Sequence, residues 1–259
     1  MQFTAARADV PAPTVDTLLM GYGLFSAQGS AGLCGVYLVR HGSRRILFDC
    51  GHVGRRKALL RSLARRKLGI RDIDTLVLSH AHWDHIQNAD LFPHADILMH
   101  PQEHGRLAAT STADPVTPPW TSAVLERSAV RRVTDGCAIA PGVRVIGLPG
   151  HTAGSIGLCV DTEQGVALLT GDAVSSAKAL REGLCTVVTA GRDAAARSVR
   201  RVRARASLVY PGHDRPFTVT DGEPDRYLLP RADLVATPPD PLTAEPERAH
   251  PCTRKEPVR

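Results

Sequence analysis

The stretch LSHAHWDHIQNADLF, residues 78–92, contains four side chains that commonly bind metals, and they fall within six residues. His80 and His82 are two residues apart near the end of an apolar predicted strand, so their rings point to the same side and can reach one ion. Asp84 and His85 follow where the chain turns toward a predicted short helix, and they can address a second ion. Zinc accepts imidazole nitrogen and carboxylate oxygen, so this turn predicts roughly half of the ligands of two ions.

Three further candidate ligands each follow an apolar predicted strand and a glycine. They are His151 in LPGHTAGS, Asp172 in LLTGDAV and His213 in VYPGHDRPF. A glycine lets the backbone turn sharply close to a site, and a sheet brings its strand ends to one shared edge. Each motif alone is common, but together with the HAHWDH cluster they predict one metal centre. Its seven candidate ligands are His80, His82, Asp84, His85, His151, Asp172 and His213.

Composition predicts a cytoplasmic protein with a sizeable core. The chain has 259 residues, 43% of them hydrophobic, which suits one large domain. It has no apolar run of the roughly 18–20 residues that a membrane span needs, and its first residues lack the apolar centre of a secretory signal. We therefore expect no membrane association. The six cysteines form no CxxC pair, so we expect free thiols in a reducing compartment.

The net charge of +6 and the isoelectric point near 9.2 admit an acidic partner such as RNA. The excess comes from arginine, however, which fits a bias of genome composition, and a nucleic-acid partner is not favoured. Two arginine-rich stretches, 55–67 and 192–205, are interpreted as solvated outer faces of helices that cover a sheet. A track for a phosphate backbone is the alternative. The sequence carries no signal for the oligomeric state.

The chain repeats one order of elements in two blocks: hairpin, helix, strand and histidine-rich turn. The first block runs from the hairpin GVYLVRHGSRRILFDCG (35–51) through a predicted helix over 55–69, with Gly69 as its C-cap, to the HAHWDH turn. The second block comprises the hairpin IGLCVDTEQGVALLTGDA, the helix RDAAARSVRRVRARA and the strand SLVYPGHD. We predict one domain over residues 1–228 and a proline-rich, flexible tail over 229–259.

HAHWDH followed by GHT, TGD and PGH resembles the metallo-β-lactamase-fold hydrolase superfamily, over roughly residues 15–220. The resemblance implies an α/β fold, a four-layer αββα sandwich of two similar halves, which agrees with the two blocks. It also implies that Asp49, in LFDCG, orients a ligand histidine. The implied ligands are His80, His82 and His151 for one metal and Asp84, His85 and His213 for the other, with Asp172 bridging them.

The implied activity is that of a dinuclear-zinc-dependent hydrolase, in which a metal-bound hydroxide attacks the substrate. Asp84 is the candidate catalytic residue, because it can orient the hydroxide while it binds metal. Iron or manganese are alternatives to zinc. Such chemistry needs no serine or cysteine nucleophile, and Cys50 and Cys159 are interpreted as core residues.

The ligand pattern narrows the substrate to a small molecule. Asp172 stands where one class of true β-lactamases has a thiolate. Only about 40 residues separate it from His213, whereas RNA-processing relatives often carry a large insertion there. The layout most resembles the compact members grouped with metallo-β-lactamase domain-containing protein one. We predict a small ester, lactone or thioester as substrate. The alternatives are a compact metal-dependent ribonuclease or phosphodiesterase, and a non-catalytic metal-binding scaffold.

Other residues receive lesser roles. Ser175 stands near the place where lactonases carry a tyrosine, and Tyr210 is either a core residue or a phenol that positions substrate. The segment 101–130, with Trp120, is expected to overhang the site. His94, His100 and His104 are interpreted as residues that bind no metal.

Overall fold

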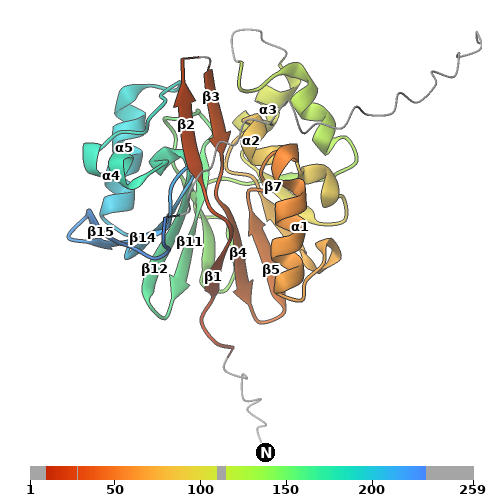
Figure 1. Ribbon diagram of the computed structural model, residues 1–259, viewed down its shortest axis with the longest axis horizontal. Coiled ribbons are helices and arrows are strands. Elements are labelled where there is room, and N and C mark those ends of the chain that lie inside the picture. The colour runs from red at the N-terminus through yellow and green to blue at the C-terminus, as the bar shows by residue number, and fades with distance from the viewer. Residues whose placement is uncertain (1–9, 28, 110–114, 232–259) are drawn as a thin grey trace, which may run out of the picture.

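The structure, a computed structural model, describes residues 10–27, 29–109 and 115–231. In this part of the chain two large sheets stack face to face, and helices lie on both outer sides (Figure 1). The first sheet contains, in spatial order, β1 (Thr14–Leu19), β4 (Val36–His41), β5 (Arg44–Phe48), β6 (Thr75–Val77), β7 (Asp96–Met99) and β8 (Val130–Arg132). The second contains β15 (Glu223–Tyr227), β14 (Phe217–Thr220), β13 (Leu208–Pro211), β12 (Gly165–Gly171), β11 (Ile156–Thr162), β10 (Val143–Gly147) and β9 (Ala138–Ala140).

The smaller elements surround these sheets. A separate hairpin consists of β2 (Tyr22–Ser26) and β3 (Gly29–Leu33). The helices are α1 (Arg56–Arg65), α2 (Trp83–Ile86), α3 (Pro101–Ala108), α4 (Ala177–Glu182) and α5 (Arg192–Arg203). Short 3-10 turns cover Val53–Arg55, Ile70–Asp72, Ala89–Leu91, Pro119–Leu125 and Asp172–Val174. No helix among the described residues is long and apolar enough to span a membrane.

Both faces of each large sheet are buried. Successive side chains of a strand point to opposite sides, so each strand contributes to two cores. On β4, Val36 and Leu38 join the core beneath α1, whereas Tyr37 and Val39 join the core between the sheets. The strands of the second sheet also alternate between two cores. Their inner face packs against the first sheet, and their outer face packs against α4 and α5. The predicted four-layer αββα sandwich is therefore confirmed.

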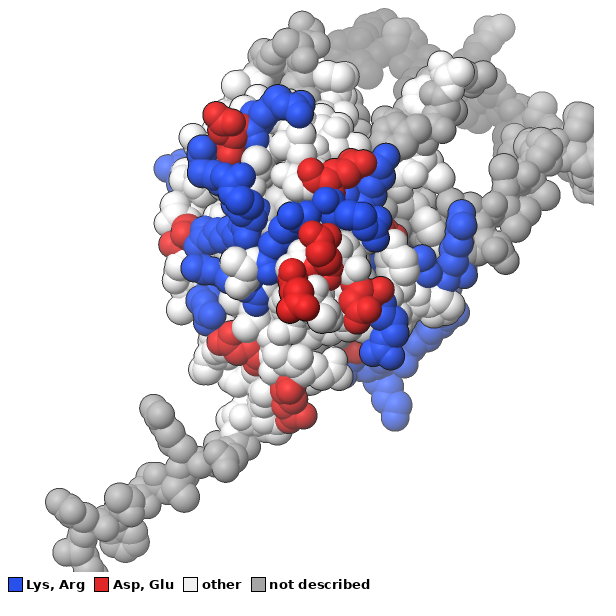
Figure 2. All heavy atoms as spheres, turned by 90° about the vertical axis from the view of Figure 1, so that its left-hand side faces the viewer, with Lys and Arg blue, Asp and Glu red and all other residues white. Residues whose placement is uncertain are grey.

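The arginine-rich stretches form outer helices, as expected. In α1, Leu59 and Leu63 are buried in the core, and in α5 Val199 and Val202 are buried against the second sheet. On the side of the molecule that carries α4 and α5, basic and acidic side chains alternate over the surface (Figure 2). On this side of the molecule, which carries α5 but not α1, the mixture favours a solvated face over a continuous basic track.

The predicted C-cap at Gly69 is wrong, because α1 already ends at Arg65. Lys67 takes the left-handed conformation, with φ of 59°, and donates its N–H to Ala64 O, while the N–H of Leu68 donates to Leu63 O. This pattern is a Schellman motif. It turns Leu68 back against the core beneath the helix. This contact stabilises the end of α1 and offsets the steric cost of the left-handed conformation at Lys67.

The two halves share one connection pattern and place their strand ends on the same side. β4 and β5 are antiparallel, and β6 returns parallel to β5 after α1. β11 and β12 are antiparallel, and β13 returns parallel to β12 after α5. Residues 232–259, nearly all of the expected tail, lie outside the described residues, as do residues 1–9. The division into a domain over 1–228 and a tail over 229–259 therefore stays a prediction.

Candidate metal centre

Three histidines form a first group at the seam between the sheets. His80 and His82 follow β6, and His151 follows β10. One nitrogen from each ring lies within 4.8 Å of the others. His82 Nδ1 is 3.0 Å from His151 Nε2, and the rings of His80 and His82 are 4.4 Å apart between centroids. His82 precedes α2 in an extended conformation. β6 already ends at Val77, so His80 and His82 lie on the same side in the loop after the strand and not on the strand itself.

Asp84, His85 and His213 form a second group. The first two lie on α2, which turns them away from the direction of the preceding strand, and His213 follows β13. Asp84 Oδ2 lies 3.7 Å from His85 Nε2 and 3.5 Å from His213 Nε2. Candidate ligand atoms of these residues also lie within 4.8 Å of one another.

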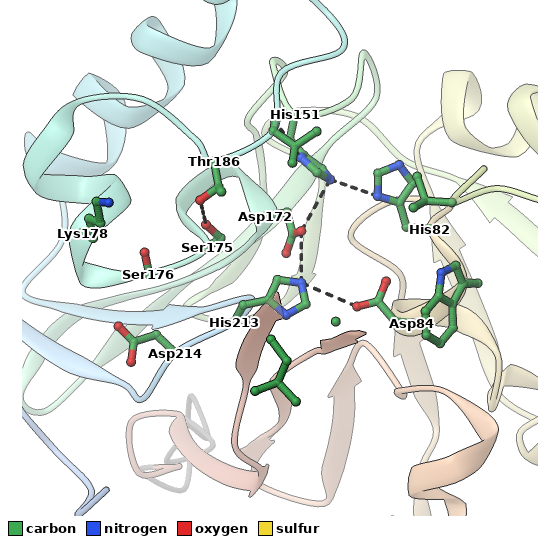
Figure 3. Close-up of a pocket in the computed structure, with 16 residues that line it drawn as sticks. His82, Asp84, His151, Asp172, Ser175, Ser176, Lys178, Thr186, His213 and Asp214 are labelled. Atoms are coloured by element: carbon green, nitrogen blue, oxygen red, sulfur yellow. Dashed lines mark hydrogen bonds and ion pairs between the residues drawn. The ribbon is translucent and has the colours of Figure 1, made fainter. Parts of the chain in front are cut away.

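Asp172 joins the two groups from the end of β12. Its Oδ1 is 3.3 Å from His85 Nε2, and its Oδ2 is 3.1 Å from His213 Nε2 and 3.5 Å from His151 Nε2 (Figure 3). A β-carbon at Gly212 would collide with Asp172 Oδ1, so the glycine before His213 leaves the space that this carboxylate occupies. The structure thus brings all seven candidate ligands together. Metal binding by them stays a prediction.

The polar atoms at the centre suit divalent cations. His80 Nε2, His85 Nε2, Asp84 Oδ2 and Asp172 Oδ1 are buried without a hydrogen-bond partner among the described residues. Such a group costs about 1–3 kcal/mol when it has no partner. Imidazole nitrogens and carboxylate oxygens that converge in this way are the ligand set of dinuclear zinc enzymes. The residues present therefore fit two metal ions.

Electrostatics favour the ligand forms of two of these groups. Burial, together with the nearby His85 and His82, lowers the pKa of His80 well below its ordinary value, so this ring stays neutral. Burial alone would raise the pKa of Asp172, but the neighbouring histidines, His213 foremost, hold it well below the ordinary range. A neutral imidazole and an ionised carboxylate are the forms that bind metal.

Three of the candidate ligand rings are held by hydrogen bonds on their outer nitrogens. His85 Nδ1 lies 2.8 Å from Asp49 Oδ2, and the other oxygen of Asp49 accepts the N–H of Ser79 at 2.8 Å. His151 Nδ1 donates to Val187 O at 2.9 Å, and His213 Nδ1 to Tyr22 O at 3.2 Å. Such bonds fix ring orientation. Asp49 therefore lies where the family resemblance implies, on a candidate ligand histidine.

A pocket of about 430 Å³ opens over the centre, in the size range of small-molecule sites. Asp84, Asp172 and three of the histidines contribute to its wall. Its other lining residues are Gly23, Leu24, Gly32, Trp83, Val116, Ser175, Ser176, Lys178, Thr186, Val187 and Asp214. Leu24 and Gly32 were not predicted from the sequence, which gives no signal that the β2–β3 hairpin reaches the site.

The residues that received lesser roles differ in whether they line the pocket. Ser175 lines the pocket, where its Oγ lies 2.8 Å from Thr186 Oγ1. Tyr210 packs edge-on against Tyr37 in the core between the sheets, which supports the first of its two alternatives, a core residue. Trp120 is exposed and absent from the pocket lining. From the described part of segment 101–130, only Val116 lines the pocket.

The structure also gives positions for the other histidines and cysteines singled out above. His100 caps α3, and His94 Nε2 lies 3.1 Å from Ile70 O. Neither they nor His104 belongs to a candidate metal group of the described residues. Cys50 and Cys159 are core residues. Sequence reasoning overlooked Cys34, a buried thiol that lies beside Asp49 and His85.

Known proteins resemble this chain across most of its length. A family model described as the metallo-beta-lactamase superfamily matches residues 30–213. The metallo-beta-lactamase domain-containing protein 1 of Xenopus laevis is 28% identical over 218 residues, which cover 80% of this chain and 82% of that protein. The human protein of the same name is 30% identical over 177 residues, 67% of this chain and 59% of its own length.

Two solved structures share the fold. One, a metallo-beta-lactamase-type protein from Thermotoga maritima, superposes with a TM-score of 0.67 at 22% identity and covers 80% of this chain and 99% of its own. The other, AidC, a dizinc quorum-quenching lactonase with a product bound, superposes with a TM-score of 0.62 at 17% identity and covers 87% and 94%. At such identities the similarity concerns the fold alone.

Proposed function

The chain belongs to the metallo-beta-lactamase superfamily, and we propose that this metal-dependent hydrolase holds two divalent ions, zinc foremost, and cleaves a small ester, lactone or thioester. The position of Asp172 supports the proposal most directly, since one carboxylate contacts histidines of both groups. His80, His82 and His151 would hold one ion, Asp84, His85 and His213 the other, and Asp172 would contact both.

Divalent ions bound there would lower the pKa of a bound water to about 7 and would polarise a carbonyl oxygen of the substrate. The chain supplies the proton transfer. Asp84 lines the pocket, so its carboxylate can orient the attacking water, accept a proton at one oxygen and return it to the leaving group. Leu24, Trp83 and Val187 provide apolar surface in the same pocket, which suits the acyl part of a substrate.

The small pocket supports a compact acyl substrate over RNA. Several surface arginines are paired with carboxylates, for example Arg201 with Asp135 and Arg203 with Glu223, which reduces the charge available to a phosphate backbone. The lactonase that shares the fold acts on a related substrate class. The described cysteines are all free thiols, which supports a cytoplasmic location.

A hydrolysis panel tests the proposal. Purified protein is assayed on acyl esters, lactones, thioesters and a single-stranded RNA, each with and without a chelator, and zinc is then added back. We expect turnover of an acyl substrate that the chelator abolishes and zinc restores. Cleavage of RNA alone would support the nuclease alternative, and absence of turnover on every substrate in zinc-loaded protein would support the scaffold.

Asp84→Ala is the matching variant. We expect its kcat to fall by at least about a hundredfold, because it loses the group that handles the proton, while circular dichroism stays unchanged. Asp90→Ala is the control, since Asp90 lies on the same segment but forms only a surface ion pair with Arg56 at 2.6 Å. Full activity of Asp84→Ala would contradict the mechanism.

A further inference from the structure

Glu103 is a buried carboxylate close to the metal centre that belongs to neither ligand group. It lies on α3 and is 1% exposed. Its Oε2 accepts the backbone N–H of Ala81 at 2.9 Å, and its Oε1 accepts that of Gly154, also at 2.9 Å. One side chain thereby connects the loop after β6 in the first sheet with the loop after β10 in the second.

Both anchored loops carry members of the same histidine group. Ala81 stands between His80 and His82, and Gly154 follows His151 by three residues. The three rings form the group whose nitrogens lie within 4.8 Å of one another. The spacing of this group therefore depends on the relative position of two peptide N–H groups, and Glu103 binds both of them.

The second loop fits tightly against α3. A β-carbon at Gly154 would lie 2.7 Å from His100 Nδ1 and 2.8 Å from Glu103 Cγ, so a side chain there forces the loop away from the helix. Beneath the loops, a backbone bond from Ile156 N to Ser79 O, 3.0 Å long, also joins the two sheets. The sheets thus stay together without Glu103, and what the carboxylate adds is the placement of the loops.

The second ligand group is held by different contacts. Asp49 holds His85, and the carbonyl of Tyr22 holds His213. Neither contact involves α3. A change at Glu103 therefore affects the two groups unequally.

We propose that Glu103 is a positioning residue that sets the geometry of His80, His82 and His151, and thereby the affinity of one of the two metal ions, without touching the ion. This inference rests on the proposed two-ion centre. A carboxylate has two acceptor oxygens for the two N–H groups, whereas a glutamine amide has one acceptor and one donor group. In Glu103→Gln one of the two loops loses its anchor and faces a donor instead.

The test is a titration of metal-free protein with Co²⁺ in competition with a chelating dye, followed by visible absorption of the bound cobalt. We expect wild-type protein to bind two ions. In Glu103→Gln one ion should bind as before and the other about tenfold more weakly or worse, with a changed cobalt spectrum. Gly154→Ala should give the same selective loss. The exposed Glu126→Gln is the matched control and should behave as wild type.

The outcomes separate this inference from the proposed function. Wild-type protein that binds fewer than two ions would contradict the two-ion centre. Two ions in wild type, with unchanged affinities in both Glu103→Gln and Gly154→Ala, would overturn the role of Glu103 alone, and equal weakening of both ions would overturn its selectivity. Circular dichroism checks that each variant folds, and if Glu103→Gln does not, Gly154→Ala decides the question.

Discussion

At the scale of single residues, Gly32 shows how closely the β2–β3 hairpin approaches the centre. A β-carbon there would lie 2.5 Å from Asp84 Oδ2 and 3.1 Å from His213 Cε1. Both of these residues belong to the second ligand group, so an added methyl group must displace a ligand or the hairpin.

We therefore predict that Gly32→Ala lowers kcat/KM at least about tenfold, because displacement of Asp84 disturbs the group that handles the proton. The melting temperature should change little, since the hairpin lies outside the two large sheets. Gly105→Ala is the control. Nothing lies within 4 Å of its β-carbon, and alanine is the better helix former by about 1 kcal/mol. Equal activity of both variants would contradict the close approach of the hairpin.

The convergence of the seven candidate ligands could be predicted from sequence, because each follows an apolar strand and the HAHWDH turn is dense in ligand chemistry. Glu103 and Gly32 could not. Glu103 acts on Ala81 and Gly154, which are 22 and 51 residues away in the chain. No local pattern distinguishes a glutamate that bonds two distant peptide groups from one on a helix surface.

At the scale of elements, regular hydrophobic patterns predicted the main hairpins and the outer helices. Strands that lack such a pattern, β3 and β15, were not predicted. β3 reads GSAGL, with few side chains large enough to signal a strand by alternation. β15 reads EPDRY, where charges and a proline argue against a strand. The end of α1 was misplaced because Arg66, Lys67 and Leu68 favour helix, and only the core contact of Leu68 explains the earlier stop.

One buried hydrogen bond between two strands should contribute measurably to the stability of the protein. The hydroxyl of Tyr37 on β4 donates to Pro211 O on β13 at 2.6 Å, and both groups are buried. It joins the first sheet to the strand that precedes His213. We predict that Tyr37→Phe lowers the free energy of unfolding of the metal-free protein by about 1–2 kcal/mol, because the carbonyl loses its donor.

Urea denaturation measures this loss, with Tyr227→Phe as the control. The hydroxyl of Tyr227 donates to Asp214 Oδ2 at 3.0 Å, but in an exposed place where water can replace it. If the two substitutions lower the free energy of unfolding equally, the bond between the sheets contributes no more than a surface contact, and the prediction is wrong.

At the scale of the whole molecule, the candidate centre lies where the two halves meet. β6 belongs to the first sheet, and β10, β12 and β13 to the second. Ions bound by residues from both halves would stabilise the folded chain, because the unfolded chain cannot assemble the site. We predict that zinc at a hundredfold excess over its Kd raises the stability of metal-free protein by about 2.7 kcal/mol per site, read as a higher melting temperature.

This stabilisation should depend on pH with a definite sign. Burial alone would lower the pKa of His213, but the Asp172 carboxylate raises it above the ordinary value in the metal-free centre. A proton therefore occupies this ring up to a higher pH and must leave when metal binds. The melting-temperature increase caused by zinc should grow from about pH 6 to about pH 8. An increase that stays constant or shrinks over this range would contradict the assignment of His213 as a ligand.

The proposed metal centre needs seven side chains from both halves to hold two ions. Crystals of the zinc-loaded protein, measured at the zinc absorption edge, test it most directly. We predict two anomalous peaks, one among His80, His82 and His151, the other among Asp84, His85 and His213, with Asp172 in contact with both. A map with no peak at these residues, or with a single peak that Asp172 does not contact, would contradict two-ion binding by these residues.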